Sequence, residues 1–511
     1  MATHDPVPDA RRRSGSLLSG AGVLVAGRYA VAALAWVSTI IIVNRLTKAE
    51  FGEFTFIFTL LGIVGFIADL RLSRIVLAQV LAADETEAAR VVGSYTGLRL
   101  VIGVVSYGVA MVCVAIGSAA GKFSDQIVIG TALGGLNLII LSVAFGLILL
   151  FEARLWLRDV AIANVLGQVG SFALTVSVSL AGIGTVLWFV GANLVNGILV
   201  LLFIVFALRK GARIQLSFEG SEWWAWMREA APLALGAALD TIYFRIDIVM
   251  LLILKSEVAV GIYSVGYKFS DLMGAVPIAV VTPALTLMVA AWPSDTAAFR
   301  RTFRHALVML MVAAVGACAG FLIFAGPLVT TLYPGYRASV ESARLLVVGQ
   351  GLHFFTLLAF TTLVAVHRNR LYPIAMLVGV VINIGLNLVL IPEFSYLGSG
   401  WATVITECIV LMVLGVGVMR IPGLRPLPWL ATGKVIVAGL VAGGAGWALL
   451  GRVWWPVGLA TVAVVYLALV HFLAPNGPGG LSAFAGEPHD DLLAAVEEGI
   501  DRPDIGTGFS S

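Results

Sequence analysis

Charged side chains inside long apolar stretches are the residues of this sequence whose types point to chemistry. Eight lie well inside such stretches: the bases Arg28, Arg99, Arg245 and Lys268, and the acids Asp240, Asp247, Asp271 and Glu407. A base at the centre of a bilayer costs roughly 2.5–3.5 kcal/mol, so it normally faces a partner, a ligand or a water-filled space. Guanidinium groups suit dense negative charge such as a diphosphate. Intramembrane acids suit a transported proton or Na⁺. The bases are therefore candidate ligand-binding residues, and the acids are candidate ion-coupling residues.

The same charges can also neutralise one another. Lys268 and Asp271 are three residues apart on one helical face, so they can pair directly. Arg245 points roughly 140 to 200 degrees away from both acids of its own segment around a helix. Its partner must therefore come from another helix or from a ligand, and Glu407 is one candidate.

The elements that position these charges are transmembrane helices. Of the 511 residues, 60% are hydrophobic and 12% are charged, against roughly 25% charged in soluble domains, so a soluble fold is excluded. Apolar runs bounded by charges predict an all-α polytopic protein of about fourteen spans. We place them at 17–43, 54–71, 94–117, 126–151, 159–181, 184–208, 229–254, 258–291, 305–332, 341–366, 371–391, 397–419, 430–450 and 453–474.

Local sequence echoes indicate an internal repeat of six helices. Gly52 and Gly261 lie in similar contexts 209 residues apart, and Gly184 and Gly400 lie 216 residues apart. An even repeat predicts two parallel lobes around a central cavity and transport by alternating access. The predicted organisation is a cytoplasmic N-terminal segment (1–16), an N-lobe (17–210), a cytoplasmic linker (211–228), a C-lobe (229–420), two further helices (421–474) and an acidic cytoplasmic tail (475–511).

The distribution of basic residues predicts the orientation. With the N-terminus in the cytoplasm, loop Lys and Arg residues are about three times as numerous inside as outside. We therefore expect a multi-pass protein of the cytoplasmic membrane with both termini in the cytoplasm. No sequence pattern indicates a metal or a cofactor, and His305 and His353 are read as lone histidines near span ends.

Two regions resemble a known family of membrane proteins. The first comprises Tyr243 to Asp247, Val260 to Ser264, Pro277 and Pro283; the second comprises Ile382 to Pro392, Leu397-Gly398 and Ala402 to Glu407. They look like helices seven and eight, and eleven and twelve, of polysaccharide exporters in the multidrug/oligosaccharidyl-lipid/polysaccharide (MOP) flippase superfamily. The resemblance spans roughly residues 15 to 420. Arg71 stands where the family usually has glycine.

The resemblance implies a substrate and partners. The substrate would be a polyprenyl-diphosphate-linked oligosaccharide, flipped from the cytoplasmic to the external leaflet for surface polysaccharide or O-antigen assembly. The bases listed above would then be substrate-binding. Membrane lipids and the glycosyltransferases or polymerase of the same pathway are the other implied partners, and nucleic acid is not one. In the related peptidoglycan-precursor flippases the last two helices form a groove for the lipid tail.

Two alternative functions remain at this point. One is a drug/cation antiporter of the same superfamily, which an acid-dominated cavity with satisfied arginines would favour. The other is a membrane glycan polymerase or glycosyltransferase, which usually needs large external loops. The longest predicted external loop, about 332–344, is short and offers only Arg337 and Glu341 as strong candidates. We therefore expect a transporter without enzymatic activity.

The candidate binding role of the arginines makes a first prediction. Arg28→Ala, Arg99→Ala and Arg245→Ala should each abolish glycan export, because each removes a cation from a diphosphate site, while the folded protein stays in the membrane. Surface glycan and membrane-inserted protein are measured in the same cells. Normal export by all three variants would reject the cationic site.

Overall fold

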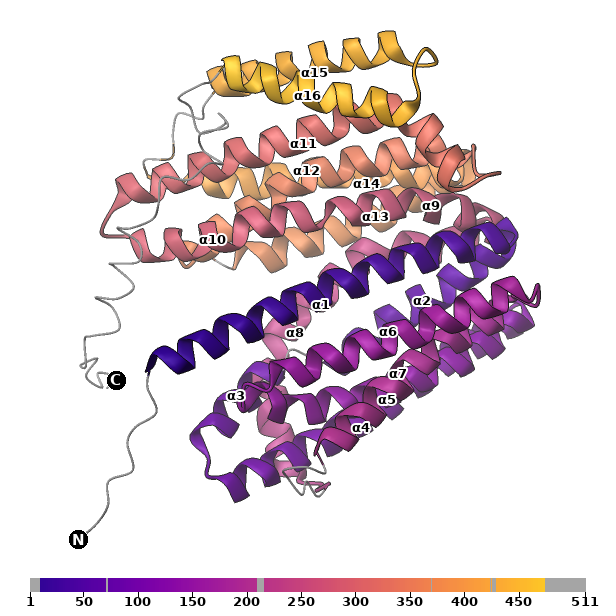
Figure 1. Cartoon of the computed structure of the whole chain (residues 1–511), viewed down its shortest axis with the longest axis vertical. Coiled ribbons are helices and arrows are strands. Elements are labelled where there is room, and N and C mark those ends of the chain that lie inside the picture. Colours follow the sequence, from indigo (N-terminus) through magenta and orange to yellow (C-terminus); the bar gives the residue numbers. More distant parts are fainter. Residues whose placement is uncertain are drawn as a thin grey trace. The chain divides into compact units, whose positions relative to one another are not determined.

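Every regular element among the residues that the structure describes is an α-helix (Figure 1). This computed structural model describes residues 10–69, 72–208, 216–368, 370–422, 424 and 429–473, without the side chains of 10–26, 66–69, 232, 233, 236, 237 and 429. The helices are α1 (Ala10–Arg45), α2 (Lys48–Asp69), α3 (Ser73–Ala82), α4 (Glu85–Ala119), α5 (Asp125–Ala153), α6 (Leu157–Leu180), α7 (Val186–Leu208), α8 (Gly220–Leu254), α9 (Glu257–Met273), α10 (Ala275–Ala291), α11 (Thr296–Leu332), α12 (Ser339–Ala365), α13 (Leu371–Phe394), α14 (Tyr396–Met419), α15 (Trp429–Leu449) and α16 (Trp455–Leu473). The predicted all-α class is confirmed.

The predicted spans coincide with these helices. Among the described residues, 12 helical segments are long and apolar enough to cross a membrane. The two remaining predicted spans coincide with α2 and α8, of 22 and 35 residues, each of which includes side chains outside the described set. The predicted span 258–291 contains two helices, α9 and α10, on either side of Gly274. The short helix α3 was not predicted, and the predicted acidic tail lies outside the described residues.

Local sequence signals set several helix starts. Asp84, Ser124 and Ser256 precede α4, α5 and α9, and the side chain of each accepts the backbone N–H three residues further on. This satisfies an N–H that has no partner within the helix. The N–H of Glu87 lies 2.8 Å from the carboxylate of Asp84 and lowers the pKa of that acid.

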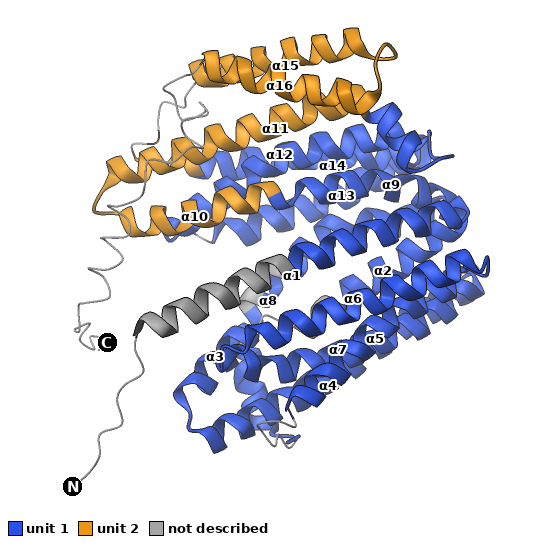
Figure 2. Ribbon diagram, in the orientation of Figure 1, with its two compact units in different colours: residues 1–275, 325–417 blue, residues 276–324, 418–511 orange. Residues whose placement is uncertain are grey.

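The chain divides into two compact units (Figure 2). Unit 1 comprises residues 1–275 and 325–417, and unit 2 comprises 276–324 and 418–511. The predicted N-lobe lies within unit 1, whereas the predicted C-lobe is divided between the units. The two units are defined by how compactly their residues pack, and their boundaries do not follow the predicted repeat. The two lobes therefore stay a prediction.

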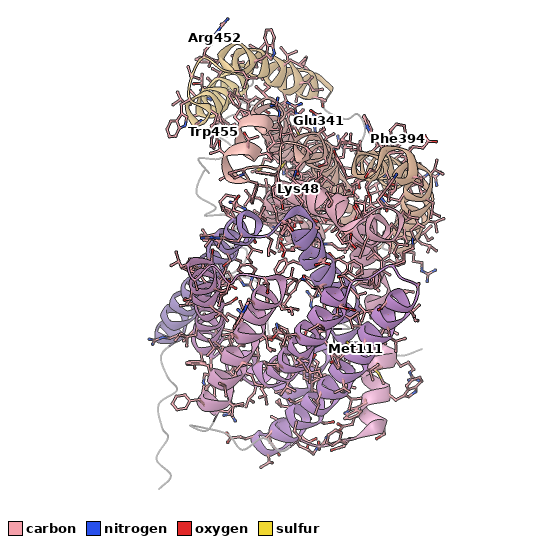
Figure 3. All side chains as sticks on the ribbon, turned by 90° about the vertical axis from the view of Figure 1, so that its right-hand side faces the viewer. Lys48, Met111, Glu341, Phe394, Arg452 and Trp455 are labelled. Carbon is pink, nitrogen blue, oxygen red and sulfur yellow. The ribbon has the colours of Figure 1, made fainter. Side chains whose placement is uncertain are left out.

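Unit 2 contains a C-terminal hairpin that packs on α11. Tyr466 of α16 is buried, and its hydroxyl donates to the carbonyl oxygen of Val312 in α11 at 2.8 Å. Lys434 at the start of α15 donates to the carbonyl of Leu473 at the end of α16 at 2.7 Å. A cation at that position satisfies a carbonyl that the helix leaves free. Figure 3 labels Arg452, which lies in the turn between the two helices, and Trp455, the first residue of α16.

Unit 1 has α8 as a shared element. The first part of α8 packs on α3 and on a core built from α4, α5 and α7, where Trp226 is buried. Its later part packs on α13 and α9. In the same unit α1 runs beside α6 (Figure 1). A single helix therefore carries residues that contact both predicted repeats.

The first turns of α2 and α9 cross at two glycines. A Cβ atom on Gly52 would overlap the carbonyl oxygen of Glu257, and a Cβ atom on Gly261 would overlap the carbonyl oxygen of Lys48. Lys48, labelled in Figure 3, and Glu257 each stand four residues before their own glycine. The contact is therefore reciprocal, as expected for equivalent positions of a repeat, and it joins the two glycines that the sequence echo had paired.

This crossing makes a second prediction. Gly52→Ala or Gly261→Ala should destabilise the protein by about 1–3 kcal/mol, because the added methyl group must push two backbones apart. The measurement is the thermal unfolding midpoint of the purified protein in detergent. Gly62→Ala is the matched control, because a Cβ atom on Gly62 in the same helix meets nothing within 4 Å. Equal midpoints for Gly52→Ala and Gly62→Ala would contradict the close crossing.

Candidate functional site

The residues of α8 from Asp240 to Asp247 form a polar hub inside unit 1. Within these eight residues lie three of the charged side chains predicted from the sequence, Asp240, Arg245 and Asp247. Tyr243, which contacts Glu407, lies among them. Two tryptophans fix the first part of the same helix. The indole N–H of Trp226 donates to Gln79 at 3.0 Å, and that of Trp223 donates to the carbonyl of Ser94 at 3.1 Å. We call the stretch 240–247 with its partners the α8 hub.

Glu407 of α14 is the acid with the most diverse partners in the α8 hub. It is 2% exposed. Its Oε1 accepts the hydroxyl of Tyr243 at 2.9 Å and lies 3.2 Å from Nδ1 of His353 in α12. Its Oε2 accepts the hydroxyl of Thr356 at 3.1 Å. Three side chains from two helices, α8 and α12, thus supply the partners that compensate the lost hydration of one carboxylate.

Asp247 is buried against tyrosines of α9. It is 1% exposed, and its Oδ2 accepts the hydroxyls of Tyr263, at 2.8 Å, and Tyr267. Its Oδ1 accepts the backbone N–H of Ile248 at 2.8 Å. Because these donors are neutral, they stabilise the carboxylate without cancelling its charge. The neighbouring Arg245 acts on Asp247 electrostatically.

Asp240 connects the α8 hub to α13. Its Oδ1 accepts the hydroxyl of Tyr372 at 3.0 Å. The ring of Tyr372 also packs on Phe360 of α12, with 3.8 Å between the ring centroids. The eight-residue stretch of α8 therefore has polar or ionic contacts with α9, α13 and α14, and it reaches α12 through the edge-on contact of Phe244 with His353 at 4.9 Å.

Arg245 pairs with Asp271 of α9. One guanidinium nitrogen lies 3.3 Å from Oδ1 and 3.5 Å from Oδ2 of Asp271, and the group lies over the ring of Tyr267 at 5.2 Å. The prediction that its partner comes from another helix is confirmed, although that partner is Asp271 and not Glu407. The prediction of a direct Lys268–Asp271 ion pair is wrong: Asp271 lies within ion-pair distance of Arg245, and Lys268 acts on Asp271 only electrostatically. Lys268 is half-buried, and no ion pair within 4.0 Å joins it to a described acid.

The other two predicted bases lie on helices of the first repeat. Arg28 of α1 is exposed and acts electrostatically on Glu152 of α5. Arg99 of α4 is 4% exposed, and its guanidinium lies near the rings of Tyr95 and Phe145, at 5.6 and 5.7 Å. In this conformation Arg99 is thus enclosed by protein, whereas Arg28 is accessible.

The sequence analysis missed His353 and the two tyrosines of α9. His353 does not lie near a span end: it occupies the middle of α12 and faces Glu407. The available signal was a titratable side chain deep in an apolar run, which by itself suggests a role. Tyr263 and Tyr267 gave no such signal, since tyrosine is common in membrane helices.

The α8 hub can hold charge in two ways. Its buried acids are surrounded by hydroxyl, backbone and histidine donors, an arrangement that suits a proton or a cation. Its more exposed face carries Arg245, with 37% of its side chain exposed. In the described part of the chain, no three His, Cys, Asp or Glu residues come together in a metal-binding arrangement.

The fold is shared with transporters of the MOP superfamily. The lipid II flippase MurJ in an inward closed conformation aligns with a TM-score of 0.71 at 11% identity, over 89% of this chain and 99% of its own. An inward-facing multidrug resistance MATE transporter of the MOP superfamily aligns at 0.61 and 12% identity, over 76% and 94%. A MOP superfamily transporter from Pyrococcus furiosus aligns at 0.53 and 15% identity, over 80% and 94%. The chain therefore has the fold of these transporters.

A comparison of the sequence with family models gives a more specific assignment than the fold does. A family model described as "Polysaccharide biosynthesis protein" matches residues 42–336, more than half of the chain. The chain belongs to this polysaccharide biosynthesis protein family. No curated protein matches the sequence. The resemblance to polysaccharide exporters of the MOP superfamily, predicted from the motifs of four helices, is confirmed.

The donors around Glu407 make a third prediction. Tyr243→Phe should lower the free energy of unfolding by about 2 kcal/mol, because it removes a hydrogen bond to a buried carboxylate. The measurement is the thermal midpoint in detergent. Tyr29→Phe is the matched control, since Tyr29 is 75% exposed and should change stability little. If the two variants unfold at the same temperature, the hydrogen bond to Glu407 contributes nothing to stability.

Proposed function

We propose that this protein is a flippase that moves a polyprenyl-diphosphate-linked oligosaccharide from the cytoplasmic to the external leaflet by alternating access. The proposal rests on two findings that concern the same residues, the family match and the fold match. The polysaccharide biosynthesis family covers residues 42–336, and these residues belong to a fold shared with a lipid II flippase. The product would serve surface polysaccharide or glycan assembly.

The proposed substrate-binding residues are the accessible bases. Arg245 reaches Asp271 through one nitrogen, at 3.3 and 3.5 Å, which are long distances for a charge-assisted bond. Such a partly exposed pair stabilises little and exchanges readily for another anion. Lys268 stands one helical turn from Asp271 and adds positive charge to the same surface. Arg28 would add a base from the first repeat, and Arg99 would take part only in a conformation that exposes it.

The proposed ion-coupling residues are the acids of the α8 hub, Asp240, Asp247 and Glu407, together with the more exposed Asp271. A proton or Na⁺ bound among them changes the net charge of a site that joins several helices. Binding at such a site can favour one arrangement of those helices over another. The sequence-based lobes, 17–210 and 229–420, would be the bodies that move.

The proposed setting is the cytoplasmic membrane, with both termini in the cytoplasm. A multi-pass membrane protein follows from the apolar helices, and the distribution of basic residues supports the orientation. Glycosyltransferases or a polymerase of the same pathway would supply or consume the lipid-linked glycan. The chain itself would move the glycan without altering it.

A drug/cation antiporter is the second candidate function. Two observations favour it: Asp247 and Glu407 are buried acids of the α8 hub, and Arg245 already has an acidic partner. An organic cation would then replace the proposed diphosphate as the ligand.

The fourth prediction tests these functions. Purified protein in lipid vesicles should move a fluorescent polyprenyl-diphosphate disaccharide between leaflets faster than empty vesicles do, as measured by quenching of the outer leaflet. Arg245→Ala should slow this movement by about tenfold or more, because a charge-assisted contact with the diphosphate is lost. Arg344→Ala is the matched control: Arg344 forms an exposed pair with Glu341 and has 34% of its side chain exposed, close to that of Arg245.

The same vesicles separate the alternatives. No movement of the lipid above empty vesicles, together with uptake of an organic cation such as ethidium, would replace the flippase proposal by the antiporter. Equal effects of Arg245→Ala and Arg344→Ala on lipid movement would remove Arg245 from the binding site.

A further inference from the structure

The contact between His353 and Glu407 differs chemically from the Arg245–Asp271 pair. An arginine stays charged at every physiological pH, whereas an imidazole gains and loses a proton near neutrality. Glu407 is 2% exposed at its side chain and His353 is 18% exposed. The buried acid of this pair is therefore matched with a base whose charge can change.

The geometry places a proton between the two atoms, as in the Nδ1–H tautomer of a neutral His353 that donates to Glu407. Nδ1 of His353 lies 3.2 Å from Oε1 of Glu407. When both atoms are deprotonated, two lone pairs face each other, so the contact is favourable only with a proton on one of them. With that single proton the pair carries one negative charge, and a second proton makes it neutral. The hydroxyls of Tyr243 and Thr356 donate to the carboxylate but supply no charge.

The charged surroundings of His353 are acidic. Glu407 acts on it from α14 and Asp240 from α8, and Tyr243 of α8 is the other titratable group at the site. Helix α9 also packs on α12. Its charged residues Lys268 and Asp271 interact with each other and with Arg245. A proton taken up by the pair therefore reduces the net negative charge of a buried cluster.

We propose that His353 and Glu407 together form the site at which a transported proton binds and drives the movement of the lipid-linked substrate. This inference rests on the proposed flippase function and names the ion that powers it. The pair joins α12 to α14, and Tyr243 joins both to α8. With the second proton bound, the pair is an imidazolium–carboxylate ion pair, which holds these three helices together most strongly. Loss of that proton leaves the weaker hydrogen bond of a neutral imidazole and so favours their separation. By linkage, a change in the helices also changes the affinity for the proton.

The fifth prediction uses vesicles with a pH difference of one unit across the membrane. The full-length protein should move the fluorescent polyprenyl-diphosphate disaccharide at a rate that responds to this difference by up to about tenfold, the limit for one coupled proton. His353→Gln keeps an amide that can donate to Glu407 but does not titrate, so its rate should not respond. His305→Gln is the matched control, because His305 is exposed on α11, and it should respond like the natural protein. A normal response in His353→Gln would overturn the proposal.

A second measurement needs no substrate. In histidine-labelled protein, the NMR resonance that is missing from His353→Gln should titrate between about pH 5 and 8. Its midpoint should shift in Glu407→Gln, which retains hydrogen bonds to Tyr243 and Thr356. A resonance that does not titrate, or a midpoint unchanged by Glu407→Gln, would overturn the proposal. If the natural protein moves no lipid at all, the flippase function fails, while this titration still decides whether the pair binds a proton.

Discussion

A charged group inside the apolar helices of this chain is costly unless it finds a partner, because hydrocarbon offers no hydrogen bonds. The α8 hub is where this constraint acts most strongly. Asp247 and Glu407 are almost fully buried, and each is satisfied by donors from other helices. A carboxylate left without those donors would be far costlier than an apolar residue at the same place. The positions of α9, α12, α13 and α14 around α8 are therefore tied to these few contacts.

Helix α8 connects this hub to the first repeat. Its early residues belong to a core of the first repeat through Trp226, while its later residues carry the buried acids. Gln79 of α3 and Ser94 of α4 accept hydrogen bonds from Trp226 and Trp223, so a single helix links those two helices to the hub.

The crossing of α2 and α9 is a second constraint, and it is steric. Gly52 and Gly261 let two backbones approach closely because neither carries a side chain. The contact is reciprocal, as expected for equivalent positions of an internal repeat. Each glycine faces the carbonyl oxygen of the residue that stands four positions before the other glycine. Contacts of this kind depend on van der Waals fit alone and break without leaving a charge unpaired.

The sequence by itself determined the class of protein, the placement of the helices and the family, because apolar runs, charge clusters and a few motifs are local properties of a chain in a bilayer. It also identified the bases and acids within the apolar runs as the residues of interest. Only the tertiary structure decided the partners: Asp271 pairs with Arg245 instead of Lys268, and His353 faces Glu407 from the middle of α12. Pairing depends on the rotation of each helix about its axis and on which neighbour it meets. Hydropathy fixes neither, since an apolar helix is soluble in lipid at any rotation and only packing against other helices selects one.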